Sequence, residues 1–157
     1  MSNYWLDSHA HTVVISEMTV VGDHSNKNRN IFPPLLRGMI VKDFHDALRV
    51  NSENYKGWVN YHIVGQTGLP PDGCGVFYDK ISHYVKDLRL EGGIITAKIK
   101  TFNYPEGKRL EQLIEKNAVI FRMVGEGSIA IENGSFVVQN DFVLKNIHAI
   151  PTGEVNE

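Results

Sequence analysis

The sequence predicts an α+β fold, a mostly antiparallel β-barrel or sandwich of six to seven strands with two main helices. Three observations lead to this prediction. Apolar and polar residues alternate over residues 95–100, the period of a half-buried strand. Asn133 and Gly134 separate two short apolar segments, and Asn-Gly favours a hairpin because a type I′ turn needs positive φ at both central residues. Two further segments have apolar residues at helical spacing.

The first part of the chain predicts a strand followed by a long helix. Residues 13–21 are rich in β-branched side chains, which favours a strand, and the polar residues 23–30 predict a loop. Pro33 and Pro34 then open a helix over residues 34–50, since first-turn N–H groups have no intrahelical partner to lose. Its apolar stripe consists of Leu36, Met39, Ile40, Phe44, Ala47 and Leu48.

The middle of the chain predicts three strands and an irregular loop. Residues 58–64 are aromatic and β-branched, which favours a strand. Residues 65–75 hold four glycines and two prolines, so we expect them to be irregular. Residues 81–102 predict two strands around a turn at residues 91–93.

The remaining segments predict a second helix and the last strands. Pro105 starts a helix that ends near Lys116 and Asn117, with Leu110, Leu113 and Ile114 facing inward. The strands expected after it cover residues 118–124, 128–132, 135–139 and 142–150, and residues 152–157 form a polar tail. We expect the helices to pack outside the sheet or across one end of it.

Composition sets the broad class. The chain has 157 residues, which predicts a single domain over residues 1–157. The net charge of −2 gives no overall attraction to nucleic acid or to an anionic membrane, so nucleic acid is not an expected partner. One cysteine, Cys74, excludes an internal disulfide and any CxxC motif. We also expect no signal peptide and no membrane-spanning segment, because the apolar runs are short.

The polar residues offer few candidates for a metal site or a phosphate site. His9 and His11 share one face of a strand, but only Asp7 and His24 are available as further ligands, so we expect no metal. No Walker-type glycine loop is present, and no cofactor is expected. The loop at residues 26–30 is interpreted as a solvated connection rather than a phosphate contact.

The nucleophile candidates are equally weak. Cys74 lies in a glycine-rich loop without a basic neighbour to activate it. Ser128 follows Gly125, Glu126 and Gly127 but precedes a strand, whereas a nucleophile elbow leads into a helix. The histidines outside the N-terminal segment are expected to be packed and hydrogen-bonded; they are His45, His62, His83 and His148.

Four segments in a fixed order carry a further signal. They are an Asn/Arg-rich, aromatic-proline entry to the first helix at residues 28–33, a hairpin at 85–99, a proline-glycine helix start at 103–110, and Gly125 to Gly127 followed by Gly134 and residues 141–144. In this order they resemble the tailed-phage prohead proteases, capsid-maturation serine proteases whose fold resembles herpesvirus assemblin. The resemblance covers residues 19–151 and implies a prohead-protease-like fold.

The sequence departs from that family where catalysis is expected. The stretch that matches the family's histidine motif, residues 65–71, has Leu69 at the histidine position. Near Met123, where the family has its serine, no serine occurs between Ala118 and Glu126. Because neither leucine nor methionine can transfer protons or attack a carbonyl, the resemblance implies a phage protein without catalytic residues.

The resemblance therefore implies a binding role, most naturally as a virion or capsid-assembly component in the host cytoplasm or the virion. Its partners would be other phage structural proteins or copies of itself. If the chain binds a partner, we look first at residues 65–75, with Arg29, Gln66 and Arg122 as candidate contacts. Two alternatives stay open: an early phage protein that inhibits or sequesters a host defence component, and a divergent protease that uses Ser128 with His62 or His148.

Overall fold

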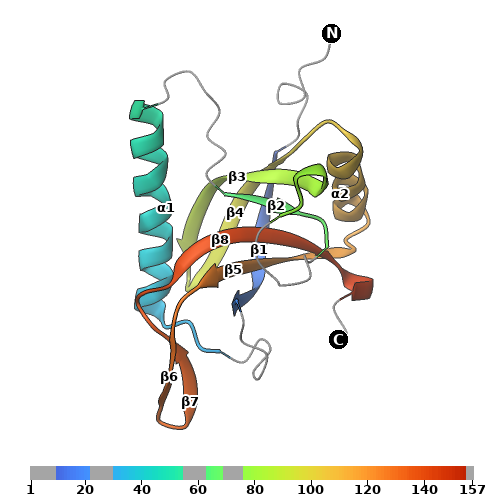
Figure 1. Cartoon of the computed structure of the whole chain (residues 1–157). Helices are drawn as coiled ribbons and strands as arrows, with labels where there is room; N and C mark the ends of the chain where they lie inside the picture. Colours follow the sequence, from blue (N-terminus) through green and yellow to red (C-terminus); the bar gives the residue numbers. More distant parts are fainter. Residues whose placement is uncertain (1–9, 22–29, 55–62, 69–75, 155–157) are drawn as a thin grey trace.

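The computed structural model describes residues 10–21, 30–54, 63–68 and 76–154. In this part of the chain, six strands form one curved sheet in the order β2-β3-β4-β1-β5-β8, and a separate hairpin, β6-β7, projects from it (Figure 1). Two α-helices flank the sheet. The predicted α+β fold with a mostly antiparallel, nearly closed barrel is confirmed.

The strand β1 (Ala10–Val20) lies in the middle of the sheet. It pairs antiparallel with β4 (Ile94–Thr101) and parallel with β5 (Val119–Glu126). A parallel pair cannot be joined by a tight turn, so the chain between β1 and β5 is long and contributes three other strands before it returns. The central pairing therefore brings together segments that are far apart in the sequence.

On one side of β1, the sheet continues through a hairpin. The strand β3 (Ile81–Glu91) pairs antiparallel with β4, and the turn between them holds Gly92 at φ 58° and Gly93 at φ 81°. Two consecutive positive φ angles favour glycine, so the predicted hairpin at residues 81–102 is confirmed together with its turn. The short strand β2 (Val64–Gln66) pairs with the start of β3.

The barrel closes between β2 and β8 (Val143–Pro151), which is the last strand on the other side. Thr67 forms a parallel bridge with Ala149, and the Gly68 N–H donates to the Ala149 carbonyl at 2.7 Å. Because β2 has only three residues, it joins β3 to β8 along a small part of their length. The first residues of β8 thus have no strand beside them on this side among the described residues.

The helix α1 (Pro34–Asn54) lies beside β3 and the start of β8 and covers this part of the barrel (Figure 1). Its buried face contributes Leu36, Ile40 and Phe44 to the core. Phe32, just before the helix, packs edge-on against Phe142 with ring centres 5.1 Å apart. The helix starts where predicted and extends four residues beyond the predicted end at Val50.

The helix α2 (Pro105–Glu115) covers the opposite end of the barrel and buries Leu110 completely. After it, Asn117 adopts φ 53°, so the chain leaves the helix near the predicted end. The hairpin of β6 (Ile129–Glu132) and β7 (Ser135–Val138) turns at Asn133 and Gly134 with φ 52° and 79°, as the Asn-Gly pair predicts.

The structure corrects the sequence prediction around β2. Residues 58–62 of the predicted strand lie outside the described residues, and the observed strand contains Gly65 and Gln66, which we expected to be irregular. These residues form a strand because β3 offers them backbone partners, and local glycine content is overridden by this tertiary pairing. Two single-turn 3₁₀ helices, Tyr78–Lys80 and Thr152–Glu154, complete the described elements.

Neither α1 nor α2, the helices in the described ranges, has the length and apolar content that crossing a membrane requires.

Candidate functional site

Two of the predicted contacts, Gln66 and Arg122, lie in a group of largely buried polar side chains on neighbouring strands. We call this group the polar cluster; it comprises Glu17, Gln66, Thr67, Ser82, His83, Arg122 and His148. Its members come from β1, β2, β3, β5 and β8 and from the residue that follows β2. The pairing of β1, β5 and β8 places Glu17, Arg122 and His148 side by side, and closure of the barrel between β2 and β8 joins them to the residues of β2 and β3.

A chain of hydrogen bonds crosses the cluster. The Thr67 hydroxyl donates to Ser82 Oγ at 3.0 Å, and the Ser82 hydroxyl lies 2.8 Å from His83 Nδ1. His83 Nε2 lies 2.7 Å from the Ile147 carbonyl, which only accepts, so Nε2 carries the ring proton and Nδ1 accepts from Ser82. Ser82 and His83 are both 0% exposed, so this serine–histidine pair is sealed in the core.

The backbone of β2 approaches this chain so closely that position 65 must be glycine. A Cβ at Gly65 would lie 1.9 Å from the Ile147 carbonyl oxygen and 2.7 Å from His83 Nε2. Both distances are far below van der Waals contact. The Ile147 carbonyl is part of the backbone, so it cannot move aside as the end of a flexible side chain could. Gly65 therefore allows β2 to lie against the hydrogen bond between His83 of β3 and the Ile147 carbonyl of β8.

The second buried imidazole, His148, has one bonded nitrogen and one without a partner. The Gln66 N–H donates to His148 Nδ1 at 3.2 Å, so in the neutral ring the proton lies on Nε2. This Nε2 is buried and has no hydrogen-bond partner among the described residues. The pKa of His148 is lowered to about 4, mainly by burial, with electrostatic repulsion from His83 and Arg122 acting in the same direction.

Burial also lowers the pKa of His83 to about 4, against a smaller opposing effect of its bond to Ile147. Both imidazoles are therefore neutral at pH 7. A neutral imidazole with a strongly lowered pKa is a weak base, which limits what the cluster can do in proton transfer.

The two predicted contacts in the cluster are occupied by internal partners. Arg122 Nε donates to Glu17 Oε1 at 2.6 Å, and the side chains of this ion pair are 14% and 17% exposed. Register places Arg122 directly opposite His148. Gln66 is 3% exposed, and its side-chain oxygen accepts from the Phe77 N–H at 2.9 Å. The third candidate, Arg29, lies outside the described residues.

Ser128 lies away from the cluster. It is exposed just before β6, and its N–H donates to Asp141 Oδ1 at 3.0 Å. Hydrogen bonds from the backbone and side chain of Ser128 lower the pKa of Asp141. Arg122, the residue opposite His148, is separated from Ser128 by the rest of β5, which ends at Glu126.

His11, a candidate metal ligand within the described residues, is bonded to a carboxylate. His11 Nε2 lies 2.6 Å from Glu111 Oε2, which also accepts from the Thr101 hydroxyl at 2.7 Å. Residues 10–21, 30–54, 63–68 and 76–154 contain no group of three metal-ligating side chains. The remaining candidates lie outside those ranges: His9, His24, His62, Leu69 and Cys74.

Sequence analysis missed Glu17, Thr67 and Ser82 as members of the cluster and treated His83 as an ordinary packed side chain. Residues 82–85 are all buried, so β3 is covered on both faces there and shows no alternation that would distinguish a cluster residue from a core residue. The adjacent serine and histidine were the available signal, but adjacency on a strand normally places two side chains on opposite faces.

Comparisons with known proteins identify the fold. No family model matches the chain, and no curated protein matches it by sequence. Among solved structures, the chain is similar to the bacteriophage T4 capsid assembly protease, gp21, with a TM-score of 0.63 and 13% sequence identity. The match covers 91% of this chain and 98% of gp21. The prohead-protease-like fold implied by the sequence resemblance is thus supported.

Proposed function

We propose that this chain is a phage-encoded protein with a prohead-protease-like fold that does not cleave peptide bonds and acts by binding during capsid assembly. Its partners would be phage structural proteins or further copies of itself, in the host cytoplasm or the virion. The likeness to gp21 along nearly the whole of both chains supports the link to capsid assembly. The observation that carries the absence of hydrolysis is the closed polar cluster, with Arg122 opposite His148.

Hydrolysis by a serine protease needs a hydroxyl that the substrate can reach and a base beside it. Ser82 has a base beside it, His83, but substrate has no access to a pair that is 0% exposed. His148 has an arginine as its neighbour across the sheet, and the charge of that arginine disfavours the imidazolium that a general base must form. Both features favour a structural use of these polar groups.

The protease alternative, with Ser128 as nucleophile, has less support. From Arg122 to the end of β5 is a separation of four residues, about 13 Å at the rise of a strand, and Ser128 lies further on. A nucleophile must lie within hydrogen-bond reach of its base. Ser128 instead bonds to the segment after β7: its N–H donates to Asp141 Oδ1, and its carbonyl accepts from the Gln139 N–H.

Mass spectrometry of purified proheads and mature virions tests this proposal. A capsid-assembly component is expected in a fixed ratio to the major capsid protein in proheads or virions. If the chain is abundant early in infection but absent from both proheads and virions, the proposal is contradicted. That result would favour the early inhibitor of host defence. Loss of normal capsid-protein cleavage in a phage with Ser128→Ala would favour the protease.

A further inference from the structure

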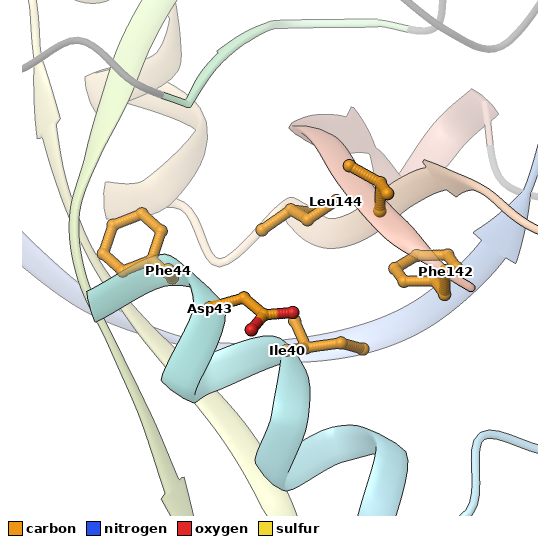
Figure 2. A pocket seen from close by; sticks show the side chains of 6 residues that line it. Ile40, Asp43, Phe44, Phe142 and Leu144 are labelled. Atoms are coloured by element: carbon orange, nitrogen blue, oxygen red, sulfur yellow. The ribbon is translucent and has the colours of Figure 1, made fainter. Parts of the chain in front are cut away.

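A small hollow lies between α1 and the start of β8, on the side where β8 has no neighbouring strand among the described residues (Figure 2). We call it the α1–β8 hollow; its volume is about 100 Å³, and it is lined by Ile40, Asp43, Phe44, Phe142, Val143 and Leu144. Five of these six residues are apolar. Figure 2 shows the Asp43 carboxylate facing the space between Ile40, Phe44, Phe142 and Leu144.

The one charged group of the hollow, the Asp43 carboxylate, makes no hydrogen bond or ion pair within the described residues. Asp43 is exposed, and the neighbouring Lys42 interacts with it only through its charge, because the Lys42 ammonium is hydrogen-bonded to Asp46. The neighbouring carboxylate on the same helix differs, because Asp46 accepts from Lys42 Nζ at 2.8 Å. An unpaired carboxylate at the rim of an apolar hollow is complementary to a side chain with an aliphatic stem and a cationic end.

The part of β8 that lines the hollow also has a strand edge to which an extended segment can add. Val143 and Leu144 lie opposite Glu126 and Gly125 of β5 on one side, and on the other side β2 contacts β8 from Asn146 to Ala149. Residues 143–145 therefore have no neighbouring strand on that side among the described residues. A strand edge with unpaired N–H and C=O groups is a template for another extended segment. Val143, at this edge, is 54% exposed.

We propose that the α1–β8 hollow binds one lysine side chain of an extended partner segment, which adds to the open edge of β8 and places the lysine ammonium against Asp43. This inference goes beyond the proposed function, because it specifies the chemistry of a ligand and the place where it binds. Neither the similarity to gp21 nor the polar cluster indicates these.

Size favours lysine over arginine. A volume of about 100 Å³ is small, and it suits a linear stem of a few methylenes better than a bulky group. The compact ammonium needs a single carboxylate, whereas a guanidinium is planar and is best satisfied by bidentate pairing. The alternation of an extended segment turns the residues on either side of the lysine away from the hollow.

The test uses the full chain and fluorescein-labelled pentapeptides, with binding followed by fluorescence anisotropy. The probe has the sequence Thr-Val-Lys-Val-Thr. Three matched peptides carry norleucine, arginine or glutamate in place of lysine, and a fourth keeps the lysine but is N-methylated on the two flanking valines. Norleucine keeps the stem without the charge, and N-methylation removes the donors that strand addition requires.

We expect the lysine peptide to bind about threefold to fivefold more tightly than the norleucine peptide, the range of an exposed ion pair. Asp43→Asn should abolish this difference. The matched control Asp46→Asn makes the same change of net charge one turn along α1 and should preserve it. Amide chemical shifts of residues 143–145 should move on titration with the lysine peptide, and the N-methylated peptide should not bind.

Several results would overturn the proposal. These are no binding of the lysine peptide at millimolar concentration, equal binding of the lysine and norleucine peptides, or arginine binding more tightly than lysine. Equal weakening by Asp43→Asn and Asp46→Asn would also overturn it, since that result assigns the effect to net charge. Concentration-dependent dimers that Asp43→Asn dissociates would assign the hollow to a second copy of the chain instead.

Discussion

The polar cluster and the α1–β8 hollow use polar groups in opposite ways. In the cluster, hydroxyls, imidazoles and an ion pair are buried and nearly all bonded to one another, as with Ser82 and His83. In the hollow, the carboxylate of Asp43 is exposed and makes no hydrogen bond or ion pair among the described residues. The buried polar groups therefore contribute to the stability of the barrel, whereas the proposed contact with a partner uses an exposed carboxylate.

This contrast leads to a general expectation about where substitutions act. Changes in the polar cluster should alter the free energy of unfolding, because buried polar groups lose their partners. Changes in the hollow should alter binding of the lysine peptide and leave the free energy of unfolding unchanged. The predictions below test the contrast from the largest expected effect to the smallest.

The largest effect should come from pH. The unfolded chain protonates its imidazoles near pH 6.5, whereas the lowered pKa values of His83 and His148 keep them neutral in the fold down to about pH 4. Stability is therefore full above pH 6.5 and falls as pH decreases toward 4, by up to about 3 kcal/mol for each imidazole. Urea unfolding at a series of pH values measures this dependence.

Carboxylates also titrate in acid, so a variant is needed to identify the contribution of an imidazole to the pH dependence of stability. His148→Asn keeps an acceptor for the Gln66 N–H but does not titrate, so the slope between pH 6.5 and 4 should decrease, whatever the stability at pH 7. An equal slope in the His148→Asn variant and in the unsubstituted chain would exclude His148 as a source of the pH dependence.

Gly65→Ala should destabilise the fold by about 3 kcal/mol or more, because its Cβ would overlap the Ile147 carbonyl and force β2 away from β8. Gly153→Ala is the matched control, since a Cβ at Gly153 meets nothing within 4 Å. Urea midpoints compare the two. A midpoint for Gly65→Ala within error of the control would refute the close approach of β2 to the cluster.

Glu17→Gln should destabilise the fold by about 2 kcal/mol, because it leaves the largely buried Arg122 charge without its counterion. Adding Arg122→Met should recover part of the loss, as removal of both charges leaves no unpaired ion. The exposed pair of Lys42 and Asp46 provides the comparison, and Asp46→Asn should leave the urea midpoint unchanged. Additive losses for Glu17→Gln and Arg122→Met would show that the two side chains are not coupled.

The smallest effect on stability should come from Asp43→Asn. This exposed carboxylate has no hydrogen bond or ion pair to lose among the described residues, so the urea midpoint should equal that of the unsubstituted chain while binding of the lysine peptide weakens. A shift of the midpoint as large as that of Glu17→Gln would mean that the hollow is part of the structural core, and the contrast between the two regions would fail.

The sequence predicts those parts of the fold that local chemistry determines. The hairpin at Asn133 and Gly134, the turn at Gly92 and Gly93, and the helix that starts at Pro34 are all found, because each depends on backbone preferences of nearby residues. The strand β2 was misplaced, since Gly65 and Gln66 form a strand only where β3 and β8 supply partners far away in the sequence.

The candidate site was predictable only in part for the same reason. Gln66 and Arg122 were singled out by sequence, but their partners, Phe77 and Glu17, are set by the tertiary arrangement; Glu17, for example, lies opposite Arg122 in the parallel pair of β1 and β5. Nothing in the pattern around Asp43 separates it from Asp46 on the same helix. The difference is that Asp43 faces the start of β8, whereas Asp46 accepts a hydrogen bond from the Lys42 ammonium.

The central claim is that a capsid-protease-like barrel uses its buried serine and imidazoles for structure and not for hydrolysis. Intact-mass spectrometry of the full chain, incubated with phage scaffolding and capsid proteins, tests this most directly. We predict unchanged masses for every component throughout the time course. Fragments that accumulate with the native chain and disappear with Ser128→Ala or Ser82→Ala would contradict the claim.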